Sequence, residues 1–445
     1  MIRKIVPPLL AVFCVFAIFT SSYLYFGREY LTWPSTSYDP ISIGHNEAQS
    51  SINSTFFKTE AKTTSVEVLS ATSSVPAPTP TILNGTILSA ERISLYISAI
   101  LDPGATALPR LSCPALNTQR YKELQRHEKQ ESKTDYFFAL NLRNCKDILP
   151  QLLGSIIEVC RYLDVNTCAL SVVEGNSKDG TADILSALDP YLKDLGLVYF
   201  YNNSKIDPSK NARIKKLAQL RNLALEPLVK NRVSASPQTT ILFLNDVAPC
   251  PEDILELALQ RKRLSADACC AMDWTYAGEH PTFYDVWVAR TIKGDSFFDV
   301  GSDGSWDNAW ALFWNEQATR ERFENKKPFQ VFACWNGATA INAAPFLNGL
   351  RFRESHPKEC FQGEPTLLSK DLWHRGFGKI AVIPSVNLEY SIEQAAKIKR
   401  LKGYVSDIVG NEDDDAIEWK DSPPENVKCM PTWETQSWRP WNETL

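Results

Sequence analysis

An uncharged apolar run, Ile5 to Phe26, stands near the N-terminus and follows Arg3 and Lys4. A helix of this length spans the roughly 30 Å hydrocarbon core of a bilayer. The basic residues before it predict a cytosolic tail at residues 1–4, a membrane anchor at 5–26 and a luminal remainder. A cleaved secretory signal is the alternative, but no small-x-small cleavage site follows the run. Both interpretations send the chain through the secretory pathway.

The next segment is polar and rich in Ser, Thr and Pro, from about Pro34 to Leu108. Such a composition buries too little apolar surface to offset the entropy lost on ordering. We therefore expect an extended stem over residues 27–112, interrupted by a short helix at Ser89 to Leu101. A disordered tail without function fits the same composition.

Beyond Cys113, apolar runs of strand length alternate with helix-length amphipathic segments. The expected strands are Tyr136–Arg143, Cys168–Glu174, Leu197–Tyr201, Ile241–Leu244 and Ala268–Met272. The expected helices are Ile148–Tyr162, Thr181–Leu195, Ala212–Glu226 (stopped by Pro227) and Pro251–Arg263. This alternation predicts an α/β fold with a mainly parallel sheet flanked by helices, in a domain over residues 113–410. Residues 411–445, which begin with an acidic run, are expected to form a C-terminal tail.

Composition narrows the possible partners and the compartment. A net charge of −5 gives no basic footprint for nucleic acid. Glycosylation acceptors of the N-x-[ST] form occur at Asn53, Asn84, Asn202 and Asn442. Of the 11 cysteines, Cys14 falls in the predicted anchor, and the even remainder suits luminal disulfides of undetermined pairing. The sequence contains no CxxC pair, so we do not expect a structural zinc site.

Ligands of parallel sheets bind at the carboxyl ends of the strands, so the turns there are the candidate site. After the second strand come Glu174, Asn176 and Asp179, in a Gly-containing turn that enters a helix. Such a turn can hydrogen-bond a ribose or a base, or aim backbone N–H groups at a phosphate. An ordinary strand-to-helix turn capped by Asp179 or Thr181 is the more frequent reason for the same pattern.

Asn245 and Asp246 follow the fourth strand. A carboxylate at this place can hold a divalent cation against a diphosphate, because hard cations take oxygen ligands and keep phosphates in their shell. The alternative is a carboxylate that caps the next helix, although Pro251 begins that helix several residues later.

Between these turns, residues 210–222 form a locally basic helix in an acidic protein. Most of its cations are expected on a solvated face. Arg221 lies in an otherwise apolar face, and we expect it to point inward at a phosphate or a carboxylate.

The order of these blocks resembles that of GT-A glycosyltransferases: SVVEGNSKDGTADIL, then LAQLRNLAL, then ILFLND. The resemblance implies that the first block contacts the nucleotide and that the last is the metal site. Cys334 to Ile341 resembles the acceptor-side segment of these enzymes, which makes Trp335 and Asn336 candidates for acceptor binding. Gln362 to Glu364 is similar to their acidic motif, which makes Glu364 a candidate catalytic residue beside Asp246.

Two longer stretches, PTFYDVWVARTIKGDSFFD (281–299) and GEPTLLSKDLW (363–373), resemble the capsule-associated α-1,3-mannosyltransferases of fungi. The likeness runs from about Tyr136 to Tyr390. It implies a single-pass type II Golgi enzyme that acts on a capsule or cell-wall polysaccharide. It also implies GDP-mannose as donor, a divalent metal such as Mn²⁺, and retention at the anomeric carbon.

The sequence departs from the GT-A pattern at two places. The metal motif reads Asn245-Asp246-Val247 and has one carboxylate, so a metal-independent enzyme or a non-catalytic glycan-binding scaffold is the main alternative. Tyr390 stands where a late histidine ligand is common, while His356 and His374 lie earlier. A glycoside hydrolase would also need paired carboxylates, but the strand before Asp246 does not favour that class.

Three further residues have two interpretations each. Asp273, after the fifth strand, either faces the cleft or caps a loop. Asp285 and Arg290 fall in the family-like stretch, where a buried ion pair and a donor contact are equally good explanations.

Overall fold

The computed structural model describes residues 81–126, 133–277, 280–410 and 416–445. The predicted anchor, most of the predicted stem and Asn53 therefore lie outside the described residues. Within the described ranges, no helix combines the length and apolar character needed to cross a membrane.

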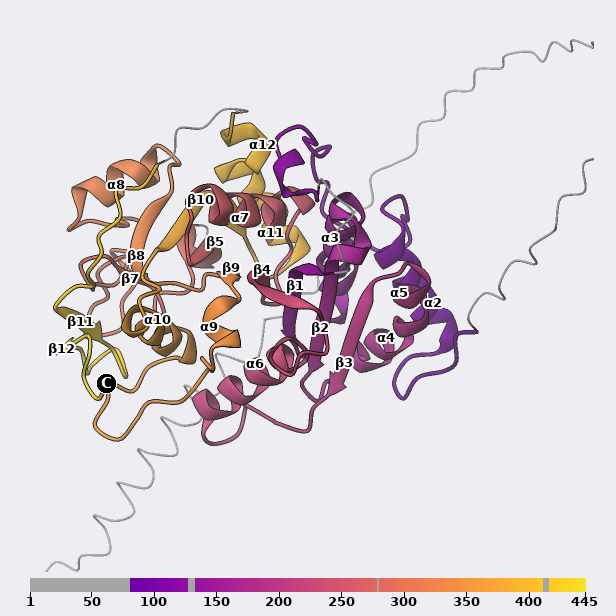
Figure 1. Cartoon of the computed structure of the whole chain (residues 1–445), viewed down its shortest axis with the longest axis horizontal. Helices are drawn as coiled ribbons and strands as arrows, with labels where there is room; N and C mark the ends of the chain where they lie inside the picture. The colour runs from indigo at the N-terminus through magenta and orange to yellow at the C-terminus, as the bar shows by residue number, and fades with distance from the viewer. Residues whose placement is uncertain (1–80, 127–132, 278–279, 411–415) are drawn as a thin grey trace, which may run out of the picture. The chain divides into compact units, whose positions relative to one another are not determined.

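The centre of the fold is a ten-stranded sheet with the order β3-β2-β1-β4-β9-β5-β10-β8-β7, and β6 pairs with β5. Figure 1 shows β3 toward one end of this sheet and β7 and β8 toward the other. The strands are β1 Thr134–Leu142, β2 Cys168–Glu174, β3 Val198–Asn203, β4 Ala235–Leu244, β5 Ala268–Ala277, β6 His280–Phe283, β7 Arg290–Thr291, β8 Phe329–Ala333, β9 Ala338–Asn342 and β10 Ile380–Leu388. A separate two-stranded sheet joins β11 Asn426–Cys429 to β12 Ser437–Pro440.

The predicted α/β class is confirmed, but the sheet is mixed. Strands β3, β2, β1 and β4 are parallel, as expected. Strand β9 runs antiparallel between β4 and β5, and β10 pairs parallel with β5 but antiparallel with β8. The prediction of a mainly parallel sheet is therefore wrong for the second half. The strands that reverse the direction there have two to five residues, too few for a periodic pattern to reveal them.

Helices cover both faces of the sheet because neighbouring strand residues point to opposite sides. Phe138 and Leu140 of β1 belong to the apolar core that contains residues of α3 (Leu149–Leu163) and α7 (Pro251–Arg263). Phe137 and Ala139 of the same strand belong to the core on the α6 side (Arg213–Val229). The helices that follow α7 in the chain are α8 Gln317–Glu324, α9 Ala344–Leu347, α10 Glu364–His374, α11 Ile392–Lys402 and α12 Val405–Ile408.

Proline explains two differences from the expected helices. The segment expected as one helix at Thr181–Leu195 is split into α4 (Thr181–Ala187) and α5 (Asp189–Asp194), with Pro190 in the first turn of α5. The stop expected at Pro227 is wrong, since α6 continues through it to Val229. Near a helix end, proline removes one hydrogen bond without reversing the chain.

The folded unit begins before residue 113, so the expected boundary of the stem is wrong. The short helix expected near residues 89–101 is confirmed as α2 (Ala90–Leu101), whose N-cap is Ser89. Its residues Ile93, Tyr96, Ile97 and Ile100 are buried in the same core as α3. This apolar face gives α2 the packing energy that the surrounding Ser- and Thr-rich composition lacks.

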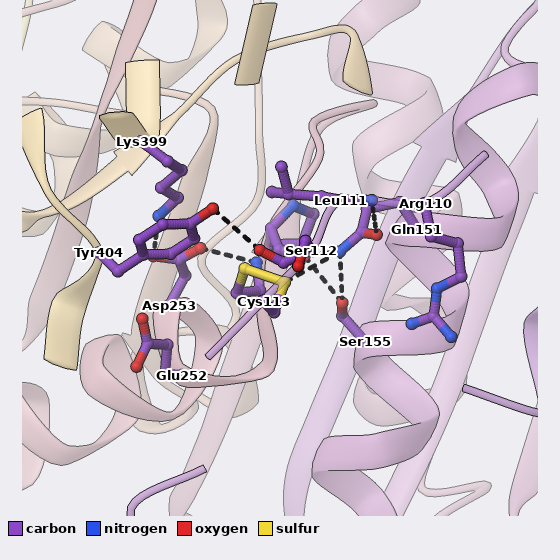
Figure 2. The surroundings of a disulfide bond; sticks show 12 residues. Arg110, Leu111, Ser112, Cys113, Gln151, Ser155, Glu252, Asp253, Lys399 and Tyr404 are labelled. Carbon is purple, nitrogen blue, oxygen red and sulfur yellow. Dashed lines mark hydrogen bonds and ion pairs between the residues drawn. A yellow bond between two sulfur atoms is a disulfide. The ribbon is translucent and has the colours of Figure 1, made fainter. Parts of the chain in front are cut away.

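A disulfide between Cys113 and Cys250 fixes the segment after α2 to the N-terminus of α7. Figure 2 shows its surroundings: the Leu111 N–H donates to Gln151 Oε1 at 2.8 Å, and the Tyr404 hydroxyl donates to the Ser112 carbonyl at 2.9 Å. The segment that leads into the first strand is thus held by α3, by α7 and by the C-terminal helices.

Residues 416–445 are also part of the fold and not a tail. The Lys428 N–H donates to the Gly294 carbonyl at 2.8 Å, and a disulfide joins Cys429 to Cys360, just before α10. Gly294 has φ +86°, and a Cβ there would lie 2.3 Å from the Asn426 carbonyl oxygen, so this contact requires glycine.

Six of the ten cysteines that follow the predicted anchor form disulfides, the third of which is Cys270–Cys334. The other four, Cys145, Cys160, Cys168 and Cys269, are buried and free. They occupy small apolar positions in the core, a common use of cysteine.

Glu252, drawn in Figure 2, makes the stability of the folded protein depend on pH. It is 2% exposed, and its Oε1 atom has no hydrogen-bond partner. Burial, with a further contribution from the neighbouring Asp253, raises the pKa of Glu252 to about 7. The folded state therefore favours the protonated acid, and the associated stability is lost as the pH rises through about 7.

We expect Glu252→Gln to stabilise the protein at pH 8 by about 1–3 kcal/mol, since each pKa unit corresponds to about 1.4 kcal/mol. At pH 5 the variant and the parent protein should unfold at nearly the same temperature. Glu256→Gln is the matched control: it weakens the buried pair with Arg120 (2.7 Å) and should destabilise at both pH values. Thermal unfolding across this range would contradict the assignment if Glu252→Gln showed the pH dependence of the parent protein.

Candidate functional site

Most of the predicted site residues meet at the carboxyl end of the parallel strands. Asn245 and Asp246 follow β4, and Glu364 is the first residue of α10. The turn from Trp335 to Gly337 leads into β9, which lies between β4 and β5.

This turn is bound directly to the end of β4. The Asn245 N–H donates to the Gly337 carbonyl at 2.8 Å, and the Trp335 indole donates to Asn245 Oδ1 at 2.9 Å. Asn336 and Gly337 both have positive φ, +53° and +79°. A Cβ on Gly337 would lie 3.1 Å from the Cβ of Asp273, so the turn packs closely against the middle of β5.

Asp246 is half-buried at this junction. Burial raises the pKa of its carboxyl group, and no lysine or arginine in the described ranges pairs with it. A cation at this carboxylate would compensate the cost of burying it. Among the described residues, no group of three or more His, Cys, Asp or Glu side chains could hold a metal ion alone. The residues present therefore fit a cation that is bound by Asp246 and takes its other ligands from phosphate and water. The Asn245 side-chain oxygen, which was expected to be a further ligand, already accepts the hydrogen bond from the Trp335 indole.

Arg221 points inward, as predicted, and its partner is a carboxylate. Its Nε atom donates to Glu364 Oε1 at 2.7 Å, and their side chains are 11% and 2% exposed. The guanidinium carbon lies 4.2 Å from the ring centre of Trp335 and 5.3 Å from that of Phe243. These cation–π contacts add to the ion pair and fix the guanidinium in one place.

The residues after β2 form an internally bonded turn. Glu174 is fully buried and accepts the N–H groups of Asn176 (3.2 Å) and Ser177 (2.7 Å). Asp179 accepts the Thr181 N–H at 3.0 Å and the Lys146 N–H at 3.0 Å. Burial favours a higher pKa for Asp179, but these hydrogen bonds outweigh it and lower the pKa.

Asp179 thus holds the turn by accepting the N–H of Thr181, the first residue of α4, although the N-cap residue itself is Gly180. A phosphate cradle made of the backbone N–H groups of Asn176 and Ser177 is not observed, because both groups bond to Glu174. Asn176 itself has an exposed side chain and φ +61°. Contact of Glu174, Asn176 and Asp179 with a nucleotide stays a prediction.

Trp335 and Asn336, expected to bind an acceptor, are 2% and 0% exposed. The Asn336 amide nitrogen donates to the Ala271 carbonyl at 2.9 Å. Both side chains are buried and hold the turn in place through hydrogen bonds to Asn245 and to the Ala271 carbonyl. Direct contact of either side chain with an acceptor stays a prediction. His356 and His374 take part in no metal-binding group of the described chain.

Two carboxylates for which the sequence allowed several roles are central to the site. The Tyr390 hydroxyl donates to Asp273 Oδ2 at 2.6 Å, while Asp273 Oδ1 is buried without a partner. Burial, and then the charge of Asp285, raises the pKa of Asp273 well above its ordinary value. Asp285 does not pair with Arg290, which donates instead to backbone carbonyls such as that of Lys428. The sequence signals for these two residues were the place of Asp273 after the expected fifth strand and that of Asp285 in the family-like stretch.

Three predicted glycosylation acceptors lie in the described chain, and all are exposed. Asn202 is on the edge strand β3, and Asn442 is near the C-terminus. The Asn84 side chain accepts the Ala90 N–H at 2.8 Å at the start of α2.

We expect Arg221→Ala to destabilise the protein by about 3–5 kcal/mol, because it leaves the Glu364 carboxylate buried without its partner. Glu364→Gln keeps an oxygen to accept the Arg221 bond and should cost less. Chemical denaturation of both variants measures the difference. Equal losses below about 1 kcal/mol would show that the pair is solvated in solution.

Comparison with known proteins agrees with this architecture. Residues 135–371 match the protein family described as Cryptococcal mannosyltransferase 1. The chain is 34% identical over 404 residues to the protein named Alpha-1,3-mannosyltransferase CMT1 of Cryptococcus neoformans var. neoformans serotype D, covering 83% of this chain and 86% of that protein.

Similarity to solved structures is weaker. A crystal structure of GalNAc-T7 with UDP, GalNAc and Mn²⁺ is 16% identical and covers 58% of this chain and 44% of that one, with a TM-score of 0.37. The mannosyltransferase PcManGT of Pyrobaculum calidifontis, with GDP-Man and Mn²⁺, is 10% identical and covers 61% and 62%, with a TM-score of 0.35. The chain thus spans less than two thirds of each of these structures, and values this low support no argument about the site.

The matched residues contain Asp246, Asp273, Asp285 and Glu364, so the carboxylates gathered at the carboxyl edge of the sheet lie inside the shared region. By the extent of both sequence matches, this chain belongs to the Cryptococcal mannosyltransferase 1 family and is a glycosyltransferase.

Proposed function

We propose that the protein transfers mannose from GDP-mannose to a hydroxyl group of a glycan acceptor, forming an α-1,3 linkage with retention at the anomeric carbon. The family supports mannosyl transfer, and the name of the Cryptococcus relative supports the linkage. A capsule or cell-wall polysaccharide is the proposed class of acceptor.

The observation that carries the proposal is the half-buried Asp246 carboxylate after β4, which has no cationic partner among the described residues. We propose that it holds a divalent cation such as Mn²⁺ together with the donor diphosphate. When bound, the cation neutralises the charge that develops on the departing diphosphate.

The protein's own residues keep this region rigid. Asn245 is fixed by two hydrogen bonds to the turn at residues 335–337, so Asp246 follows a backbone that has little freedom. Arg221 adds a fixed positive charge, although Glu364 compensates part of it. A preorganised site of this kind loses no energy to reorganisation during the reaction.

We further propose a single-pass type II protein of the Golgi membrane, anchored by residues 5–26, with the catalytic domain in the lumen. The three disulfides support an oxidising compartment. The exposed acceptors Asn84, Asn202 and Asn442 are accessible to glycosylation.

The single carboxylate at the metal motif raises the alternative of a family member that binds glycan without catalysing transfer. A scaffold would bind the glycan without releasing GDP, so the two functions separate in one assay.

The test incubates the purified full-length chain with Mn²⁺, a glycan acceptor and a panel of nucleotide sugars. We expect transfer from GDP-mannose, loss of transfer with EDTA and recovery with added Mn²⁺. Asp246→Asn should lower the rate by about 10²–10³-fold, since a neutral side chain holds the cation weakly. The measurement is product formation, and thermal unfolding checks the fold.

Asp303→Asn is a matched control, because Asp303 is exposed and accepts only a local bond from Ser305 at 2.9 Å. It should transfer at the parent rate. GDP-mannose binding and turnover that persist in EDTA would exclude the metal role. A parent protein that binds glycan but turns over no nucleotide sugar would favour the scaffold.

A further inference from the structure

Asp285 lies in the loop between β6 and β7, beside the turn that closes onto Asn245. Its Oδ2 atom accepts the Asn336 N–H at 2.7 Å. The side chain is half-buried, and its other oxygen is neither hydrogen-bonded nor fully enclosed among the described residues. The preceding residue, Tyr284, is 40% exposed. One oxygen is thus held by the backbone, and the other is open to a ligand.

The surroundings of Asp285 concentrate negative charge. Asp273, Glu364 and Arg221 all interact with it electrostatically, and Arg221 already pairs with Glu364 at 2.7 Å. Burial raises the pKa of Asp285 to about 6, while the Asn336 N–H and the Arg221 charge oppose that rise. The carboxylate thus lies among like charges, where a nearby positive charge would be stabilised.

Glu364, the residue that the family-like acidic motif suggests, is less suited to face a substrate. It is 2% exposed, and one of its oxygens is taken by Arg221 beneath the ring of Trp335. Asp285 differs from Glu364, because it is half-buried and one of its oxygens has no partner in the part of the chain that the structure describes.

The position of Asp285 relative to Asp246 is also consistent with one shared site. Strand β9 lies between β4 and β5, so Leu244 of β4 and Cys270 of β5, which both pair with β9, lie about 10 Å apart across it. The turn at residues 335–337 bridges that interval, with Asn245 bonded on one side and Asp285 on the other. A diphosphate held at Asp246 would lie beside this turn, to which Asp285 is also bonded.

We propose that Asp285 is a catalytic residue that faces the anomeric carbon of the transferred hexose and stabilises the positive charge that develops there. The inference rests on the proposed transferase function. The bond from the anomeric carbon to the phosphate oxygen breaks and leaves its electron pair on the diphosphate, while the acceptor oxygen forms the new bond to carbon. The acceptor proton passes to the released phosphate, so Asp285 is unchanged at the end.

The test compares Asp285→Asn, Glu364→Gln and the parent full-length chain in three assays: transfer, hydrolysis of GDP-mannose without acceptor, and calorimetric binding of GDP-mannose. Asp285→Asn should lower transfer and hydrolysis together by about 10²–10³-fold. Its donor affinity should change by less than about threefold, because the lost interaction forms only in the transition state. Glu364→Gln should lose much less activity.

Folding is measured separately. Asparagine retains an oxygen to accept the Asn336 N–H, and it removes the repulsion between Asp285 and Asp273, so Asp285→Asn should unfold at the parent temperature or above. A merely structural residue would instead lose stability when replaced. Asp102→Asn, an exposed aspartate at the end of α2, is the matched control and should behave as the parent protein.

Three results would overturn the proposal. Asp285→Asn could transfer at the parent rate, could lose donor affinity in proportion to its activity, or could keep hydrolysis while losing transfer, which would indicate an acceptor-positioning role. Inactivity of the parent protein with GDP-mannose would instead reject the proposed function itself, and this inference with it.

Discussion

The left-handed turn at Asn336 and Gly337 is the constraint on which the site depends. Its carbonyl binds the Asn245 N–H, one of its N–H groups binds Asp285, and its glycine packs on Asp273. A backbone with positive φ at two successive residues is stable only when its surroundings hold it. Here a fully buried Asn side chain, bonded to the Ala271 carbonyl, supplies that support. This one element therefore contacts Asp273 and Asp285 directly, and it holds the backbone before Asp246 through Asn245.

This arrangement places several negatively charged side chains close together in a buried environment. Asp273 has an oxygen without a partner, and both Asp273 and Asp285 have raised pKa values. Only Arg221 offers a compensating cation among the described neighbours of Asp285, and Glu364 shares it. Such uncompensated groups are costly in a structural core and are typical of functional sites. A substrate with a cationic centre, or a bound metal, would reduce that cost.

The periphery of the domain is tied together by contacts between distant parts of the chain. Helix α2, the Cys113–Cys250 disulfide and the segment after residue 416 all attach to helices and loops around the central sheet. The Cys360–Cys429 disulfide lies four residues before Glu364, so the C-terminal segment helps to fix the start of α10. Parts of the regions that the sequence predicted to be a stem and a C-terminal tail therefore contribute to the geometry of the site.

The sequence by itself determined the first half of the sheet and the positions of α3 and α7, and it placed Asn245 and Asp246 at the carboxyl end of a strand. These features follow from local periodicity and from the rule that parallel strands end on one side of the sheet. Family-like segments added Glu364, which no local pattern would have indicated.

Only the tertiary structure decided the antiparallel insertion of β9, the partner of Arg221 and the prominence of Asp273 and Asp285. Each of these depends on contacts between residues far apart in the chain, such as the 143 positions that separate Arg221 from Glu364. Local propensity carries no information about such contacts, because the burial and charge that decide them exist only once the chain has folded.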